Sequence, residues 1–404
     1  MMRLSQIAYY QEKNSIKAEK AEKGLPRSIW ESYSAFANTF GGLLLLGAEE
    51  MPDHTLQISG VQEPERRIQE FWHLANNTEF LSANILSDEK INIQEIDGKK
   101  IIGIEIPRAA SAYRPVYLGK DPYEGSFRRD RSGVYHCTAL EVDGMLRGRK
   151  KGRDKRVLGN FTFQNLDRET IARYRQRFAQ IHPGHPWLSL TKEEFLEKLG
   201  GGQKIEGKWH PTAAGLLMFG EEQAIIREFP SYFLAYRELK EKNHWEDVVL
   251  STSGDWSGNL CDFYSCIHGK MTASFLSFLG PAEMEASPLR KVIREILVNA
   301  IIHADYEDSY ELRVLKNKDR VVITNPGELG MVKEEAIKHG VQDAKNPILR
   351  EMFSWIGIGQ GTGEGLPMAI ALCKKYHLGE IQLQEQLHPD TVTLKLKIQP
   401  ECLK

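Results

Sequence analysis

The sequence contains no G-x-x-x-x-G-K-[ST] segment, which excludes a P-loop as its nucleotide site. It also lacks any apolar stretch long enough to cross a bilayer, since its longest aliphatic run is Leu43 to Leu46. The N-terminus shows no apolar core of signal-peptide length. These absences predict a cytoplasmic protein.

Cysteine is scarce: the chain has 5, an odd number, widely spaced. This usage is typical of free thiols in a reducing compartment and does not fit a disulfide framework. Cys261, Cys266 and His268 lie close enough in sequence to raise a metal site. Because there is no paired CxxC and no second pair of ligands, we favour buried structural cysteines.

An excess of positive charge is also missing, because 53 Lys and Arg face 55 Asp and Glu for a net charge of −2. A uniformly basic nucleic-acid binder is therefore excluded, and any such contact must come from a local patch. The 404 residues, 41% hydrophobic and 27% charged, predict a folded protein of two or three domains. The patterns of helices and strands described below predict the α+β class.

The sequence divides into four parts without internal repeats. The parts expected are an N-terminal α/β domain over 1–146, a basic linker over 147–156, an α/β middle scaffold over 157–280 and a C-terminal α/β sandwich over 281–404. In the linker, RGRKKGRDKR, 7 of 10 residues are Lys or Arg. Such a run is either a solvated linker or a phosphate-binding tether.

The C-terminal part alternates helical and strand patterns. Apolar periodicity predicts a first helix, then strands, a loop-rich middle, a helix after a glycine cluster, and two terminal strands. The segments are 290–304 (helix), 310–318 and 320–326 (strands), the helix beginning near 365, and 380–386 and 391–398 (strands).

Two polar residues share one face of the first of these helices. Glu295 and Asn299 are spaced i, i+4 on an otherwise apolar helix, and buried polar groups need partners. A metal–phosphate group would supply one, because an amide oxygen suits Mg²⁺ and a carboxylate can orient water. The alternative is a hydrogen-bonded network within the core.

Two glycine-containing segments follow. Asn325-Pro326-Gly327 ends an apolar strand and is in isolation an ordinary turn. Gly361, Gly363 and Gly365 directly precede a helix, where backbone N–H groups and the positive end of the dipole can bind an anion. A glycine hinge is the alternative.

The ordered set of an E-x-x-x-N-A helix, a strand ending in N-P-G and a G-x-G-x-G-L helix start resembles the GHKL ATP-binding fold of gyrase, histidine kinases and MutL. It is most similar to the divergent branch in RecG-like regulators. The resemblance implies that Glu295 polarises the attacking water, that Asn299 holds Mg²⁺, and that the three glycines surround the phosphates of ATP. It also implies a nucleotide lid between Glu328 and Gln360.

One position departs from that pattern. Where GHKL proteins usually read adenine with an aspartate, this chain has Asn325, beside Gly327. An amide oxygen can still accept from the adenine amino group. The substitution leaves the selectivity for adenine open.

The most distinctive N-terminal stretch is S-A-F-A-N-T-x-G-G-x-L-L-L-G, residues 34–47. Apolar periodicity from Ile29 onwards predicts a helix that is capped by Ser28 and ends at Asn38 and Thr39, followed by a buried strand. The stretch resembles the signature of the Schlafen/AlbA-type DNA-binding domain, and the resemblance covers about residues 10–146.

A basic hairpin near the end of that domain is the candidate nucleic-acid contact. Its cations are Arg128, Arg129 and Arg131, interleaved with aromatic residues that offer stacking faces. A solvated hairpin is the alternative. With the resemblance, we favour binding of DNA or RNA through the backbone, without predictable sequence specificity.

Some Schlafen proteins use acidic residues of this domain in a metal-dependent ribonuclease. The candidate acidic cluster here is Glu12, Glu19, Glu49 and Glu50. The usual Glu-x-Lys unit is transposed to Lys17-Ala18-Glu19, and a lysine cannot ligate Mg²⁺. Nuclease activity is therefore the second hypothesis.

The leading hypothesis is a nucleotide-responsive DNA- or RNA-binding protein, regulating transcription or acting in defence, with ATP and Mg²⁺ in the C-terminal pocket. ATP would change the arrangement of domains or formation of a homo-oligomer. A weak ATPase activity is compatible with it. The alternatives are a Schlafen-like ribonuclease gated by nucleotide and an interaction module in which both sites have degenerated.

Overall fold

The computed structural model describes residues 15–21, 24–51, 55–130, 133–149, 152–241, 244–341, 343–359, 364–387 and 389–403. The chain forms two compact units, one over 1–150 with 330–332 and the other over 151–329 with 333–404. Helices and strands are mixed in both, as the expected α+β class requires.

The first unit is built on a four-stranded sheet in the order β1-β2-β6-β5. β1 (Ile16–Glu19) runs parallel to β2 (Gly42–Leu46), and β6 (Lys99–Ile106) and β5 (Ile91–Ile96) pair antiparallel. Alternate residues of β2 enter two cores: Leu44 and Leu46 pack with α2 (Arg27–Asn38) and α3 (Pro64–Ala75), and Leu43 and Leu45 lie on the opposite face. Burial on both faces explains the uninterrupted leucine run.

Smaller elements complete this unit. They are the hairpin β3 (Ala48–Glu50) with β4 (Leu56–Ile58), the short helix α4 (Pro122–Gly125), the hairpin β7 (Phe127–Asp130) with β8 (Gly133–His136), and α5 (Ala139–Gly148).

The distinctive N-terminal motif serves packing. The Asn38 side chain donates to the carbonyls of Val116 (2.9 Å) and Phe127 (3.0 Å) and accepts from the Val116 amide (2.8 Å). The hydroxyl of Ser34 donates to the Val116 carbonyl at 2.6 Å. A side chain at Gly42 would overlap the ring of Phe36. The motif thus fastens α2 to the segment that leads into β7.

The expected Ser28 cap is wrong. α2 begins two residues earlier than a cap at Ser28 predicts, at Arg27, with Pro26 at the N-cap and no side-chain cap. Ser28 lies in the first turn, where its hydroxyl donates to Glu19 at 2.9 Å. The hydroxyl therefore binds the carboxylate of Glu19 on β1 and does not cap the helix. The local sequence around Ser28 does not indicate this contact.

Within the described residues of the second unit, six strands form one sheet in the order β12-β11-β13-β14-β16-β15. β13 (Leu312–Lys316), β14 (Arg320–Pro326), β15 (Gly379–Gln386) and β16 (Thr391–Ile398) form at the expected segments. β11 (Leu234–Glu241) pairs parallel to β13 and antiparallel to β12 (His244–Leu250). The sheet therefore includes strands from 157–280, and the expected boundary at 280/281 cuts across one packed structure.

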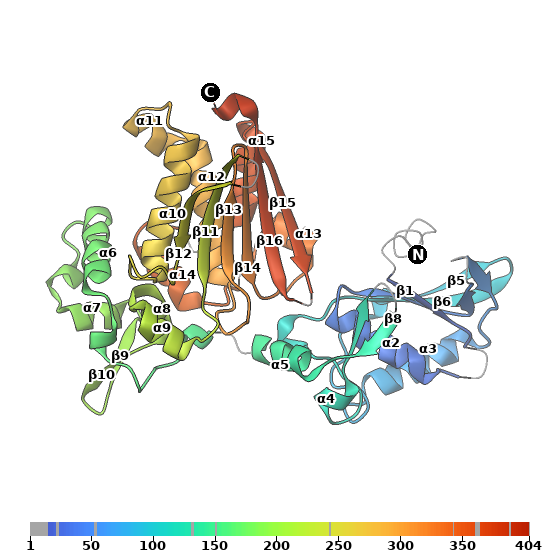
Figure 1. Cartoon of the computed structure of the whole chain (residues 1–404). Coiled ribbons are helices and arrows are strands. Elements are labelled where there is room, and N and C mark those ends of the chain that lie inside the picture. The colour runs from blue at the N-terminus through green and yellow to red at the C-terminus, as the bar shows by residue number, and fades with distance from the viewer. Residues whose placement is uncertain are drawn as a thin grey trace. The chain divides into compact units, whose positions relative to one another are not determined.

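Helices cover one face of this sheet (Figure 1). α12 (Pro288–His303) packs against β14 and α15 (Gly365–Lys375) against β15, with α10 (Leu260–Phe275) beside α12. α13 (Lys333–His339) lies near β15, and α14 (Pro347–Trp355) contacts α12.

The rest of 157–280 forms a small helical region within the second unit. Its longest helix is α6 (Arg168–Ile181), and α7 (Lys192–Lys198) starts at Thr191 with a capping box to Glu194. The other elements of this region are the hairpin β9 (Gly202–Ile205) with β10 (Lys208–Pro211), α8 (Ala213–Phe219) and α9 (Glu222–Glu228). The short helix α11 (Pro281–Ala286) follows α10 and precedes α12.

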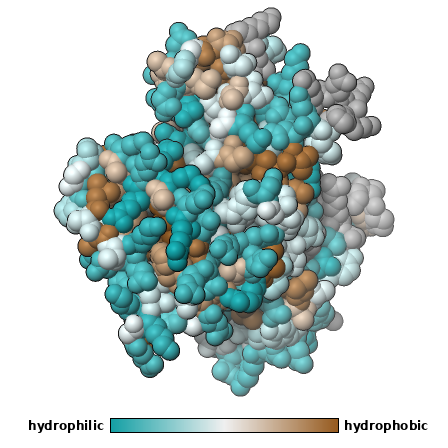
Figure 2. Space-filling view, turned by 60° about the vertical axis from the view of Figure 1, so that its left-hand side comes forward, coloured by the Kyte–Doolittle hydropathy of each residue, from teal (hydrophilic) through white to brown (hydrophobic). Residues whose placement is uncertain are grey.

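On the face shown in Figure 2, hydrophilic residues predominate and hydrophobic ones form small separate patches. Scattered patches of this size are ordinary for a folded chain. No helix among the described residues combines the length and the apolarity needed to span a bilayer.

The cysteines near His268 do not converge on a metal site. Cys261 is buried, and burial raises the pKa of its thiol to about 12. His268 stacks on Tyr264, with ring centroids 5.5 Å apart. Among the described residues, no group of three or more potential His, Cys, Asp or Glu ligands comes together.

Acid should destabilise the chain through His268. Burial, followed by the charge of Arg290, lowers the pKa of this 8% exposed imidazole from 6.5 to about 4. Below about pH 6.5 the unfolded chain therefore takes up a proton that the folded chain refuses, so this contribution to stability is complete above pH 6.5 and is lost towards pH 4. Between pH 7 and 5 we expect the free energy of unfolding to fall by about 2 kcal/mol more in the wild type than in His268→Phe. Urea unfolding at the two pH values measures this, and equal falls would contradict it.

Candidate functional site

Glu295 is buried on α12, and the half-buried Asn299 lies one turn further along the helix. Glu295 is 1% exposed, and its carboxylate accepts from Arg294 Nε at 3.0 Å. Burial raises the pKa of Glu295, and the charge of Arg294 opposes that rise. A carboxylate with a raised pKa suits a proton acceptor near neutral pH.

The amide of Asn299 is directed at the start of α15. Its buried Nδ2 has no hydrogen-bond partner among the described residues. A Cβ built on Gly365 would lie 2.7 Å from Asn299 Nδ2, 3.3 Å from Asn299 Oδ1 and 3.2 Å from Glu295 Oε2. The absence of a side chain at Gly365 therefore leaves room for both polar groups beside the first turn of α15, where unpaired backbone N–H groups favour an anion.

The structure thus brings Glu295, Asn299 and Gly365 together from segments about 70 residues apart. The other two glycines of the cluster, Gly361 and Gly363, lie outside the described residues.

Asn325 and Gly327 lie near the C-terminal end of α12, where Gly327 is next to Asp305. Asn325 is buried at the end of β14, and its Nδ2 donates to the Pro326 carbonyl at 3.3 Å. That carbonyl also accepts from the amide of Asp305 at 3.0 Å, which joins the strand end to the chain leaving α12. Asn299 lies one turn before the last residue of α12, His303, so about 6 Å of helix separates it from the helix end.

Gly327 has a conformation that favours glycine, with φ +93°. A Cβ at this position would overlap the ammonium of Lys345 and lie 3.0 Å from the Cβ of Asp305. Lys345 is half-buried and has no hydrogen bond or ion pair with the described residues. The site therefore offers a cation at this end, which sequence patterns did not indicate.

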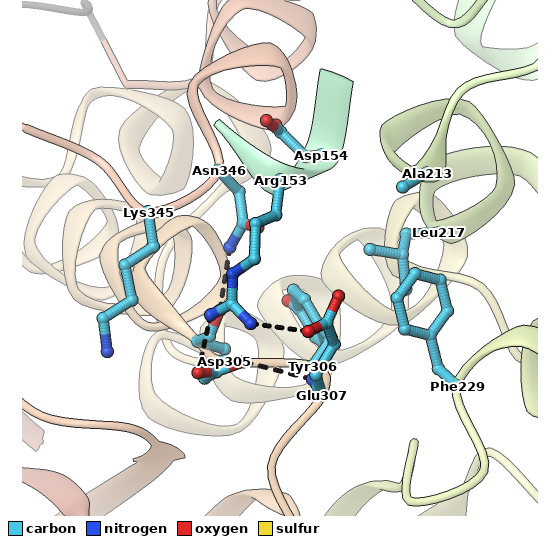
Figure 3. A pocket seen from close by; sticks show the side chains of 11 residues that line it. Arg153, Asp154, Ala213, Leu217, Phe229, Asp305, Tyr306, Glu307, Lys345 and Asn346 are labelled. Carbon is cyan, nitrogen blue, oxygen red and sulfur yellow. Dashed lines mark hydrogen bonds and ion pairs between the residues drawn. The ribbon is translucent and has the colours of Figure 1, made fainter. Parts of the chain in front are cut away.

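Beside Lys345 lies a small pocket in which Arg153 and Asp305 face each other (Figure 3). Arg153 donates to Asp305 at 2.7 Å and to Glu307 at 2.6 Å. The charges of Arg153 and Lys345 outweigh burial and hold the pKa of Asp305 below its ordinary value. Arg153 belongs to the basic run, so this part of the run is folded into the second unit and does not extend into solvent.

Other arginines of the run are also bound to protein groups. In the first unit, Arg149 donates to the carbonyls of Arg114 (2.5 Å) and Pro115 (2.8 Å). In the second unit, Arg156 pairs with Glu228 at 2.5 Å.

Replacing Arg153 by alanine should destabilise the second unit. The change leaves Asp305 and Glu307 without their shared cation at a site where Arg153 is 19% and Asp305 12% exposed. We expect a loss of about 2–3 kcal/mol in the free energy of unfolding, measured by urea denaturation. Lys155→Ala, at an exposed neighbour, is the control, and equal losses in both variants would contradict the assignment.

In the first unit, the candidate arginines contact neighbouring protein groups. Arg128 pairs with Glu141 at 3.2 Å, and Arg129 donates to the Ile16 carbonyl at 3.1 Å and lies 5.4 Å from the centre of the Phe36 ring. Burial lowers the pKa of Arg129. Arg131 lies outside the described residues.

The candidate acidic residues that are described have cationic or hydroxyl partners. Glu19 pairs with Lys17 at 3.0 Å, and Glu49 pairs with Lys20 at 2.5 Å. Glu50 faces the charge of Arg129. Glu12 lies outside the described residues. Among the residues described, the carboxylates therefore do not form a divalent-metal site.

Three family models match the chain. Residues 9–138 match "Schlafen, AlbA_2", residues 143–235 match a domain of unknown function, DUF8451, and residues 310–395 match "Putative ATP-dependent DNA helicase recG C-terminal". The chain therefore carries a Schlafen AlbA_2 domain at its N-terminus and a RecG-type domain near its C-terminus, as the motifs predict.

Two solved structures are similar to parts or all of the chain. The DIP2311 protein from Corynebacterium diphtheriae is 16% identical, with a TM-score of 0.47, 98% of this chain and 69% of that chain covered. The N-terminal domain of a RecG-related protein from Nitrosomonas europaea is 22% identical, with a TM-score of 0.26, 34% of this chain and 95% of that chain covered. No protein with a curated description matches.

Proposed function

We propose that the chain is a nucleotide-responsive nucleic-acid-binding regulator, with ATP and Mg²⁺ held in the second unit. The observation that carries the proposal is the amide of Asn299, whose buried Nδ2 has no hydrogen-bond partner in the described part of the chain and which lies with the buried Glu295 at the start of α15. A buried polar group without a protein partner is costly unless a ligand supplies one.

The residues present fit a metal–nucleotide group. Asn299 would offer its amide oxygen to Mg²⁺, which prefers oxygen ligands. The first turn of α15, with Gly361, Gly363 and Gly365, would donate backbone N–H groups to phosphate oxygens. The bound metal would neutralise phosphate charge. Glu295, with its raised pKa, would orient a water molecule and accept a proton from it.

The base would lie towards Asn325 and Gly327. Asn325 can accept from an exocyclic amino group through its oxygen, and Lys345 can donate to an acceptor near Gly327. The matched RecG-type domain supports a nucleotide-related function at a general level.

Nucleic-acid binding is assigned to the first unit, in keeping with its Schlafen AlbA_2 match. The ion pairs of Glu19 and Glu49 favour binding over cleavage, because paired carboxylates are less available to a metal. Arg128, Arg129 and Arg131 stay the candidates for phosphate contact. Regulation of transcription or defence, RNA as a ligand, and a homo-oligomer are parts of the same proposal.

Fluorescence anisotropy with labelled single- and double-stranded DNA and RNA tests it. We expect saturable binding whose affinity changes at least about fivefold when Mg²⁺ and a hydrolysis-resistant ATP analogue are added. In Asn299→Ala, nucleic-acid binding should persist and the nucleotide effect should vanish. Absence of nucleic-acid binding would contradict the proposal.

The same RNA, incubated with the protein and Mg²⁺ or Mn²⁺, separates binding from cleavage. Intact RNA is the expected result. If the wild type cleaves RNA in a metal-dependent manner and Glu19→Gln abolishes the cleavage, the protein is a nuclease and the regulator proposal is wrong.

A further inference from the structure

Helix α14 connects the two halves of the proposed nucleotide site. Before its first residue lie Lys345 and Asn346, beside Gly327 and the end of α12. After its last residue the chain passes Gly359, where a Cβ would lie 3.4 Å from Val298 of α12. The glycine cluster and α15 follow. The residues at both ends of α14 therefore lie against α12 or the strand end beside it, next to the groups of the proposed site.

At its N-terminus, α14 is capped by a residue far away in sequence. Asp154 Oδ2 accepts from the backbone amides of Ile348 at 2.7 Å and Leu349 at 3.0 Å. The adjacent Asn346 occupies the N-cap position without a side-chain cap hydrogen bond, and its Nδ2 donates to the carbonyls of Ile302 and Ala304 at the end of α12. Burial raises the pKa of Asp154 to about 6, so the carboxylate is ionised at pH 7 and interacts favourably with the helix dipole.

At its C-terminus, α14 is held by side chains of α6 and the residue that follows it. Arg177 Nε donates to the Ile356 carbonyl at 2.9 Å, and His182 Nε2 lies 3.1 Å from the Trp355 carbonyl. The hydroxyl of Tyr174 donates to the Met352 carbonyl at 2.6 Å. These are carbonyls that a helix end leaves unpaired, and a cation is favoured beside them.

The same helix end is packed by aromatic rings. The ring of Trp355 lies 4.7 Å from that of Trp187 and 5.8 Å from that of Phe178. A Cβ on Gly357 would lie 3.0 Å from Ile181 Cδ1. The contacts leave little freedom for the residues that lead into the glycine cluster.

We infer that Asp154, Arg177 and His182 are positioning residues for the nucleotide site, acting by fixing α14 at both ends. All three belong to the segment 143–235, which matches a domain of unknown function. The inference rests on the proposed nucleotide binding. The segment 143–235 would contribute to ligand binding indirectly, by holding α14, which lies outside this segment.

Arg177→Met tests the inference, because it removes the donor and the charge and keeps most of the apolar stem. The matched control is Arg168→Met, at an exposed position on the same helix. Calorimetry with a hydrolysis-resistant ATP analogue and Mg²⁺ should show affinity at least about tenfold weaker in Arg177→Met alone, at a temperature where circular dichroism shows all proteins fully folded. Arg177→Lys should recover part of the loss.

Hydrogen exchange gives a second measurement that needs no ligand. The amides of residues 356–359 should exchange faster in Arg177→Met than in Arg168→Met. Faster exchange with an unchanged affinity overturns the inference and leaves nucleotide binding intact. If the wild type itself binds no nucleotide, the proposed function fails and the inference fails with it.

Discussion

Asn299→Ala is expected to weaken binding of Mg²⁺ and a hydrolysis-resistant ATP analogue about 100-fold or more, while the free energy of unfolding stays the same or rises slightly. The combination follows from one observation. Asn299 Nδ2 is buried and makes no hydrogen bond with the described residues. Removing the amide therefore breaks no hydrogen bond between Nδ2 and the described residues, and it takes from the nucleotide its proposed metal ligand, Oδ1.

Isothermal titration calorimetry and urea unfolding, run on the same preparations, measure the two effects. Asn299→Asp is the matched variant, because it keeps an oxygen ligand for Mg²⁺ and should retain more affinity than alanine. A stability loss of several kcal/mol with unchanged affinity would instead identify Asn299 as part of a core network.

Gly365→Ala should have the second large effect on binding. The new Cβ would lie 2.7 Å from Asn299 Nδ2 and 3.2 Å from Glu295 Oε2, so it would occupy or distort the space beside both groups. We expect affinity for the ATP analogue to fall at least about tenfold. The free energy of unfolding should change by less than the affinity does, because the preference of a helix for alanine over glycine, up to about 1 kcal/mol, offsets part of the cost of the overlap.

Gly269→Ala is the matched control for this change. Gly269 lies within α10, and a Cβ there would meet no atom within 4 Å. The control should gain stability and bind nucleotide like the wild type. If Gly365→Ala behaves like Gly269→Ala in both measurements, the ligand does not occupy the start of α15.

Much of the C-terminal architecture could be predicted from local sequence. The strand β14 forms at the expected residues 320–326, and the helix of Glu295 and Asn299 spans 288–303 against the expected 290–304. Period-2 and period-3.6 patterns are sufficient there because each element buries one face. The order of the motifs along the chain also indicated that Glu295, Asn299 and Gly365 come together, as they do in the structure.

Contacts between distant segments could not be predicted in this way. The parallel pairing of β11 with β13 joins residues 234–238 to residues 312–316. Asp154 caps α14 across 194 residues, although within its basic run it looks like a solvated charge. Arg153 is likewise drawn out of solvent by Asp305 and Glu307, which no local pattern connects to it.

The N-terminal motif shows the converse limit. Its Ser34, Asn38 and Gly42 are distinctive in sequence because the packing of α2 needs them. A strong motif therefore indicated the domain without indicating which side chains touch a nucleic acid.

Both the proposed regulation by nucleotide and the proposed positioning role of Asp154, Arg177 and His182 depend on nucleotide binding. Its most direct test is calorimetric titration of the full chain with a hydrolysis-resistant ATP analogue, with Mg²⁺ and with EDTA. The account predicts saturable binding at one site per chain that is at least about tenfold weaker in EDTA and is lost in Asn299→Ala. Absence of saturable heat in the wild type, or binding that neither EDTA nor Asn299→Ala alters, would contradict it.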